Sequence, residues 1–171
     1  MKKILLACLF VLSLNSNAQN TIFDLAREGN VNQIKALVEE DSALVNSVSE
    51  QGFSPILLAV YYENESVAKY LIKAGAEVNT DSPYGTPLMA SVVKGNQSLV
   101  ELILKQNPDV NAVDQNGVNA IIYAVMFEQT KIIKKLLETN VDLNHQDKKG
   151  KSALDYAEVS SNEEIKALLL E

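Results

Sequence analysis

Gly85-Thr86-Pro87-Leu88-Met89-Ala90 is the stretch that decides the fold, because it joins a turn glycine to the start of a helix. A threonine side-chain oxygen can accept a hydrogen bond from a backbone amide at a helix start, and proline has no amide there to leave unpaired. The sequence therefore predicts that Thr86 caps a helix that continues through apolar residues to Val93. Gly95 can adopt the left-handed conformation that ends a helix.

A second helix is predicted immediately afterwards, from about Gln97 to Lys105. Leu99, Leu102 and Ile103 recur there at helical spacing and form an apolar stripe. The segment closes on Asp109-Val110-Asn111, which is typical of a turn. This part of the chain is therefore predicted to be one unit of helix, turn, helix and loop.

The same landmarks recur along the chain at nearly constant intervals. Asparagines that close a unit are separated by 33, 32 and 33 residues, and glycines that open the next unit show the same intervals. Residues suited to cap a helix are separated by 32, 33 and 33 residues. The asparagines are Asn46, Asn79, Asn111 and Asn144, the glycines are Gly52, Gly85, Gly117 and Gly150, and the caps are Ser54, Thr86, Asn119 and Ser152.

These motifs and their period of ~33 residues resemble the ankyrin repeat family. The resemblance implies an all-α solenoid of about five helix-turn-helix units with loops between them, two of the units being caps. The whole domain is expected at 19–171, with units at about 20–46, 47–79, 80–111, 112–144 and 145–171. The sequence departs from the family in two ways. Glu63 and Glu128 replace a turn glycine, and Leu57, Met89, Ile122 and Asp155 stand where the family motif Thr-Pro-Leu-His has histidine.

The first 18 residues are predicted to be a secretory signal peptide. Lys2 and Lys3 precede a short apolar run, which ends at a small-residue cleavage site before Gln19. Such a run is too short to span a bilayer, which needs ~20 residues. The segment around Cys8 resembles a lipoprotein box, but the apolar run continues beyond Cys8 and favours cleavage after Ala18. We therefore expect a periplasmic or secreted protein, not inserted in the membrane after cleavage, and the short dilysine signal favours a bacterial source.

Charge argues against one class of partner, and cysteine content argues against stabilisation by disulfides. The 171-residue chain has 15 basic and 22 acidic residues, and loss of Lys2 and Lys3 would change its net charge from −7 to −9. An acidic chain without a basic stripe argues against a nucleic-acid partner. Cys8 is the only cysteine, so the mature chain could form no disulfide.

Catalytic or metal-binding chemistry has few candidates in this sequence. No phosphate-binding glycine loop or zinc-type cysteine and histidine spacing is present. His145 is the only histidine, and it could form a metal or acid–base site with Asp142 and Asp147. The alternative is that Asn144 and Asp147 are turn residues, like Asn111 and Asp114 one unit earlier, and that His145 occupies a loop position. The loop interpretation is favoured, and we expect no enzyme activity and no cofactor.

The resemblance implies a protein that binds another protein through its loop tips and the exposed ends of the first helices, which line a concave face, and we expect it to be a monomer. Transferred by position, the residues expected to bind the partner are Phe53, Tyr61, Tyr62, Tyr84, Val93, Lys94, Met126 and Phe127. Aromatic residues and methionine are enriched at binding hot spots. Leu102 and the other stripe residues are expected in the core, and Val118 among the exposed loop residues. An inhibitor or immunity-like protein that occludes a toxin or enzyme is a further possibility, as is a small metal-binding protein or enzyme that uses His145.

Overall fold

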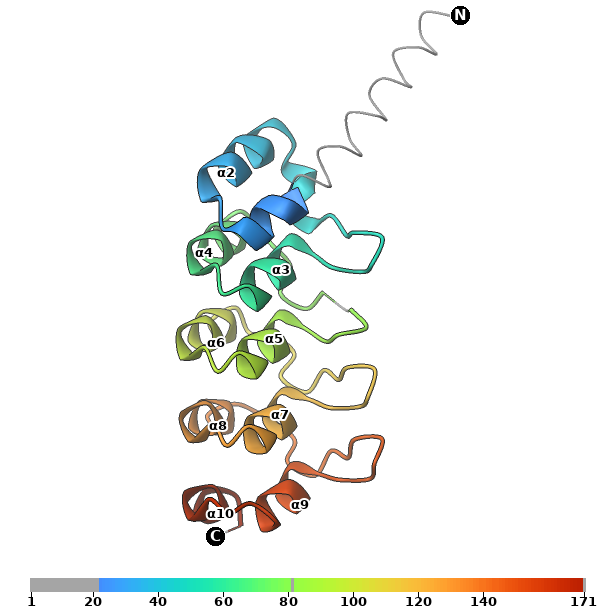
Figure 1. The fold of residues 1–171 in the computed structure, drawn as a ribbon, viewed down its shortest axis with the longest axis vertical. Coiled ribbons are helices and arrows are strands. Elements are labelled where there is room, and N and C mark those ends of the chain that lie inside the picture. The colour runs from blue at the N-terminus through green and yellow to red at the C-terminus, as the bar shows by residue number, and fades with distance from the viewer. Residues whose placement is uncertain (1–21, 81, 171) are drawn as a thin grey trace, which may run out of the picture. The chain divides into compact units, whose positions relative to one another are not determined.

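A computed structural model describes residues 22–80 and 82–170, so the predicted signal peptide lies outside the described residues. Within these ranges all regular elements are helical, and the helices follow one another in pairs (Figure 1). The prediction of an all-α, helix-turn-helix fold is therefore confirmed. The chain divides into two compact units, an N-terminal unit up to Glu77 and a C-terminal unit from Val78.

The N-terminal unit begins with a helical segment at 22–28 and continues with α2 (Val31–Glu40) and the 3-10 helix η1 (Ser42–Asn46). It ends with α3 (Pro55–Tyr61) and α4 (Glu65–Lys73). Helix α4 packs against both α2 and α3. The core of the N-terminal unit contains fully buried aliphatic side chains from each helix pair, including Ile22, Ile34, Ile56 and Leu71.

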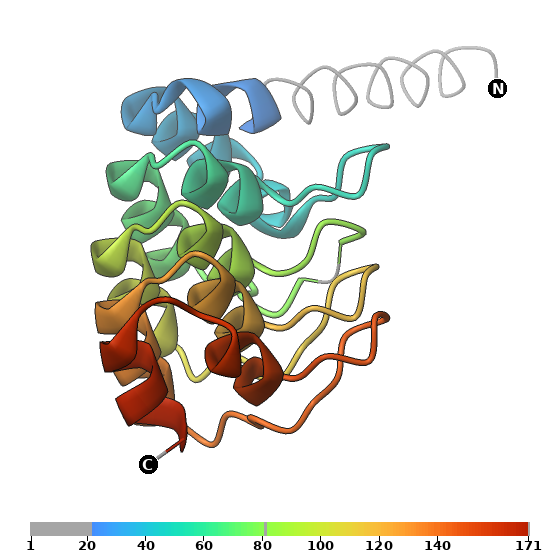
Figure 2. The same cartoon turned by 60° about the horizontal axis from the view of Figure 1, so that its bottom comes forward.

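The C-terminal unit contains three helix pairs: α5 (Pro87–Val93) with α6 (Gln97–Leu104), α7 (Ala120–Met126) with α8 (Thr130–Leu137), and α9 (Ala153–Glu158) with α10 (Glu163–Leu170). Helices α5, α7 and α9 lie side by side in one layer, and α6, α8 and α10 form the second (Figure 2). A loop precedes α7 and another precedes α9, and both project away from the helices. The core lies between the layers, where Leu99, Ile103, Ile121, Ile133 and Ile165 are fully buried.

Four capping residues start the first helix of successive pairs, as the sequence predicts. The side-chain oxygens of Ser54, Thr86, Asn119 and Ser152 each accept a hydrogen bond from the amide three residues later. Asp155 accepts reciprocally from the Ser152 amide at 2.7 Å, which completes a capping box. Asp155, which replaces the family histidine in the last repeat, therefore caps its own helix. Leu57, Met89 and Ile122, at the same position in earlier units, are buried apolar residues.

Two turns between paired helices use glutamate in the left-handed region. Glu63 has φ 59° and Glu128 has φ 53°, while Gly95 at the equivalent turn has φ 67°. The two glutamates therefore occupy the turn position predicted for them. A residue with a side chain pays ~1 kcal/mol or more for this conformation.

Two of the closing asparagines connect successive repeats within each unit through hydrogen bonds. In the N-terminal unit, Asn46 Nδ2 donates to the Gly75 carbonyl at 3.2 Å and its Oδ1 accepts from the Glu77 amide at 2.9 Å. In the C-terminal unit, Asn111 makes the same pair of bonds with Asn140 and Asp142, at 3.1 and 2.7 Å. The regular asparagine period thus has a physical cause, because the side chains of Asn46 and Asn111 each bridge to backbone about 30 residues later.

Two sequence predictions about burial are wrong. Leu102 is half-buried, and Val100 takes its place among the fully buried residues of α6. Val118, just before α7, is buried at 7% exposure, and its amide donates to Asp114 Oδ1 at 2.9 Å. Leu102 is therefore excluded from the fully buried core, and Val118 from the exposed loop residues.

Candidate interaction surface

In the N-terminal unit, the predicted binding residues at the end of α3 are exposed aromatic rings. Tyr61 and Tyr62 are 48% and 51% exposed, and their rings meet edge to face with centroids 5.5 Å apart. Phe53, in the loop before α3, is half-buried, and its amide donates to Ser49 Oγ at 3.0 Å. The two tyrosines therefore form the larger exposed aromatic surface in this unit.

In the C-terminal unit, exposed apolar side chains lie where each helix of the first layer ends. The exposed apolar residues are Val93 at the end of α5, Met126 and Phe127 at the end of α7, and Val159 at the end of α9, and the exposed Lys94 follows Val93. Val159 is the most exposed of them, at 73%. Tyr84 is also exposed, in the loop before α5. Because α5, α7 and α9 pack side by side, the residues at their ends form a row along this unit.

Phe127 is held in a defined orientation although half of it is exposed. Its ring stacks on Tyr123 with centroids 6.1 Å apart and an interplanar angle of 4°. Tyr123 is one helical turn earlier on α7. An exposed ring that is already ordered loses little conformational entropy on binding.

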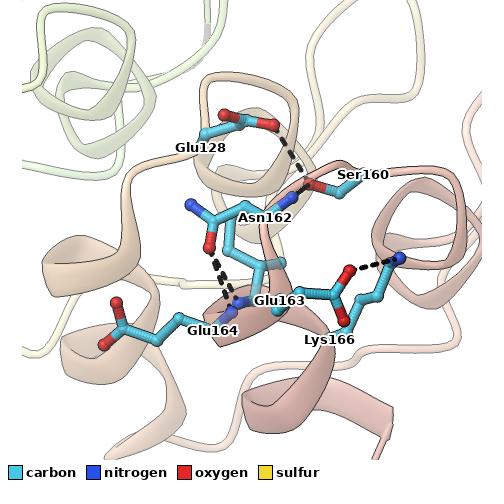
Figure 3. A network of polar contacts seen from close by, with 7 residues as sticks. Glu128, Ser160, Asn162, Glu163, Glu164 and Lys166 are labelled. Atoms are coloured by element: carbon cyan, nitrogen blue, oxygen red, sulfur yellow. Dashed lines mark hydrogen bonds and ion pairs between the residues drawn. The ribbon is translucent and has the colours of Figure 1, made fainter.

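A polar network fixes the turn after α9 against the turn after α7 (Figure 3). Ser160 Oγ donates to Glu128 Oε1 at 3.1 Å and accepts from the Asn162 amide at 3.0 Å. Asn162 Oδ1 in turn accepts from the amides of Glu164 and Ile165 at the start of α10. The network therefore holds together the two turns that carry Phe127 and Val159.

Buried aspartates order the loops that precede α7 and α9. Asp114 Oδ1 accepts from the amides of Asn116 and Val118 at 2.8 and 2.9 Å, and its Oδ2 accepts from the Tyr123 hydroxyl at 2.8 Å. Asp147 repeats this pattern with the amides of Lys149 and Lys151 and the Tyr156 hydroxyl, at 2.8, 3.0 and 2.8 Å. These pairs are not among the sequence predictions, although the sequence carries a signal for them, since each tyrosine follows its aspartate by nine residues.

The same contacts shift the pKa of each partner. Burial alone would raise the pKa of Asp114, but the hydrogen bonds from Val118, Tyr123 and Asn116 outweigh it and hold the pKa below its ordinary value. Burial and the bond to the Asp114 carboxylate raise the pKa of Tyr123 to about 12. The second pair behaves like the first, since the Asp147 pKa is lowered and the Tyr156 pKa is raised.

His145 connects the two loops and does not join a metal cluster. Its Nε2 donates to the Gly117 carbonyl at 2.8 Å, beside a backbone bond of 2.9 Å from the Lys148 amide to the Asn116 carbonyl. Gly117 has φ 74°, and a Cβ there would lie 3.2 Å from the Lys148 nitrogen, so a side chain would disturb this contact. Across residues 22–80 and 82–170, no group of three or more His, Cys, Asp or Glu side chains could hold a metal ion.

A surface pocket lies between α6 and α8. It has a volume of about 300 Å³ and is lined mainly by charged side chains, including Glu101, Lys131 and Lys135. A 3.8 Å ion pair between Lys135 and Glu101 links the two helices there.

None of the helices in the described residues is long and apolar enough to span a bilayer.

Comparison with known proteins identifies the repeat. A family model of ankyrin repeats in three copies matches residues 3–82 and again residues 88–171. The chain is 33% identical over 101 residues to the ankyrin repeat and SAM domain-containing protein 6 of Rattus norvegicus, which covers 58% of this chain and 11% of that protein. It is 29% identical over 93 residues to the ankyrin repeat protein YahD of Escherichia coli (strain K12), which covers 54% of this chain and 46% of that protein. The mitochondrial disaggregase of Bos taurus is 26% identical over 123 residues, with 70% of this chain and 18% of that protein covered. The chain thus spans less than half the length of each of these relatives.

Proposed function

The chain belongs to the ankyrin repeat family, and from this premise we propose that it is an exported, monomeric scaffold that binds a partner protein and has no catalysis of its own. Ankyrin repeats generally mediate protein–protein interaction, and proteins of this family are typically non-catalytic. In each unit, the proposed contacts are the exposed ends of the first helices and the loops before them.

The observation that carries the proposal is the kind of side chain exposed at these helix ends. Tyr61, Tyr62, Met126 and Phe127 are each 42% to 51% exposed, whereas the apolar residues at the middle of the same helices are buried. Aromatic residues and methionine are enriched in protein interfaces, where a few of them carry most of the binding free energy. Two of these rings are also preordered by ring contacts, Tyr62 on Tyr61 and Phe127 on Tyr123.

The Tyr62→Ala and Phe127→Ala variants are each expected to weaken partner binding by ~2 kcal/mol while leaving the melting temperature nearly unchanged. The partner is first captured from the envelope fraction of the source cells and identified by mass spectrometry. The purified pair is then titrated by calorimetry. Leu170→Ala is the matched control, because Leu170 is similarly exposed but lies on α10 in the second layer. If both ring variants unfold and the folded fraction binds normally, the rings are core residues and the proposed surface is wrong.

The export part of the proposal rests on the sequence of residues 1–18 alone. N-terminal sequencing of the protein purified from its own cells is expected to begin at Gln19. A retained Met1, or a lipid on Cys8, would contradict it. That result would leave the binding surface unaffected, because its residues all lie in the described domain.

A further inference from the structure

The loop before α9 concentrates positive charge in a protein that is otherwise acidic. Lys148, Lys149 and Lys151 lie within four residues, and all three are exposed. Within the part of the chain that the structure describes, none of the three forms an ion pair, defined as a lysine Nζ within 4.0 Å of a carboxylate oxygen. Three other lysines of the same unit, on α8 and α10, do form such pairs. They are Lys134 with Glu164, Lys135 with Glu101 and Glu138, and Lys166 with Glu163.

Hydrogen bonds hold the backbone that carries these three lysines. The amides of Lys149 and Lys151 donate to Asp147 Oδ1, and the amide of Lys148 donates to the Asn116 carbonyl of the preceding loop. The Lys151 Nζ lies 5.6 Å from the centre of the Tyr156 ring, whose hydroxyl is bonded to Asp147. The charges are therefore displayed from an ordered loop, which lowers the entropic cost of binding a partner.

The equivalent loop of the preceding repeat has the same framework without the charge. Asp114 corresponds to Asp147, and it accepts the same two amide bonds and the same tyrosine hydroxyl bond. Gln115, Asn116 and Val118 stand in place of the three lysines. Loop folding therefore does not require lysine at these positions. Adjacent like charges that repel one another, at positions where the loop framework does not need lysine, are the kind of local conflict expected at a functional site.

We propose that the loop of Lys148, Lys149 and Lys151 binds a carboxylate-rich segment of the partner protein and so sets the direction in which the partner lies. This inference rests on the proposed function and adds the chemistry of the partner. The chain carries a net charge of −7, so its overall field repels an acidic segment and this loop offers a local attraction. Complementary charge of this kind fixes register and excludes wrong orientations.

A nucleic acid and an anionic membrane fit the loop less well than an acidic protein segment. Arg27 is the only arginine of the chain, and it lies in the N-terminal unit, where it is paired with Asp24. Arginine is the residue most suited to bidentate phosphate recognition. Basic segments that bind anionic lipids usually cluster four or more lysines or arginines.

The test is a titration of the whole isotope-labelled chain with an oligoglutamate peptide, followed by amide NMR shifts. The loop variant carries Lys148→Gln, Lys149→Gln and Lys151→Gln. The control variant carries Lys73→Gln, Lys105→Gln and Lys131→Gln, which remove the same charge from exposed lysines elsewhere. Wild type and control are expected to show saturable shifts at 145–152 that weaken with salt. The loop variant is expected to bind about tenfold more weakly.

Two results would overturn the inference. One is equal oligoglutamate affinity in the loop and control variants. The other is tighter, lysine-dependent binding of single-stranded DNA or of phosphatidylserine vesicles, which would assign the loop to phosphate groups. Titration with the captured partner separates this inference from the proposed function. Full affinity in the loop variant refutes only the role of the loop, whereas full affinity in the Tyr62→Ala and Phe127→Ala variants refutes only the proposed aromatic surface.

Discussion

Replacing Ile103 by alanine is expected to lower the free energy of unfolding by ~2 to 5 kcal/mol. Ile103 is fully buried on α6, a helix that packs against both α5 and α8. Removal of its side-chain methyl and methylene groups loses their transfer free energy and leaves a cavity between three helices. In a repeat protein, where each repeat is stabilised mainly by its neighbours, a defect at such a contact weakens more than one repeat.

Leu102→Ala is the matched control for Ile103→Ala, since it removes a side chain of equal size from the next position on the same helix. Leu102 is half-buried, so its replacement is expected to cost ~1 kcal/mol. Urea denaturation of both variants, followed by circular dichroism, measures the difference at an unchanged denaturant slope. Equal losses in the two variants would mean that the orientation of α6 differs from the one described.

The wrong prediction for Leu102 shows that a helical pattern predicts which face of a helix is buried but not which flank of that face. Leu99 and Ile103 are four residues apart and must share a face, and both are buried. Val100 and Leu102 lie on opposite flanks of that face, and both are apolar. The pattern alone cannot choose between the flanks, because the choice depends on how α6 packs against α5 and α8.

Helix starts, by contrast, could be predicted to the residue. A cap such as Thr86 followed by Pro87 acts within one turn of helix, so its signal is local and independent of tertiary packing. The exposed positions at the ends of α3 and α7 could also be predicted, since they follow from the repeat register. That these exposed side chains bind a partner does not follow from exposure, and it remains our proposal.

Contacts between loop and helix were missed because they depend on the path of the loop. The nine residues from Asp114 to Tyr123 include a turn and a helix start, and sequence spacing alone does not place the two side chains together. The same holds for Asn111, whose partners lie about 30 residues further on. The pattern becomes visible when Asp147 and Tyr156 repeat it one unit later.

Replacing Asp114 by alanine is expected to cost ~3 kcal/mol, because hydrogen bonds to a buried charged group are worth more than neutral ones. The substitution leaves the Asn116 and Val118 amides and the Tyr123 hydroxyl without their acceptor. Asp24→Ala is the control, since Asp24 is an exposed aspartate in a surface ion pair, where the expected loss is ~0 to 1 kcal/mol. Thermal or urea unfolding at neutral pH measures both.

The Asp114–Tyr123 pair also predicts how stability depends on pH. The Asp114 pKa is lowered from 3.8 in the folded state, so its contribution is present above about pH 4 and is lost as the pH falls through the folded value. The Tyr123 pKa is raised from 10.0 to about 12, so the contribution of its hydroxyl is complete below pH 10 and is lost as the pH rises towards 12. Stability from this pair therefore declines at both ends of the pH range.

Tyr123→Phe separates the hydroxyl from the ring, which stacks on Phe127. This variant is expected to lose the part of the alkaline decline that Tyr123 causes and to keep the part that Tyr156 causes, because the Tyr156 pKa is raised as well. Asp114→Ala is expected to abolish the acid arm due to Asp114 and to reduce the alkaline arm due to Tyr123, because burial, the larger cause of the raised Tyr123 pKa, remains. If unfolding curves of Tyr123→Phe between pH 9 and 12 match those of the wild type, the hydroxyl contributes no pH-dependent stability. The Asp114 carboxylate would then stabilise the loop before α7 through the Asn116 and Val118 amide bonds and not through the hydroxyl.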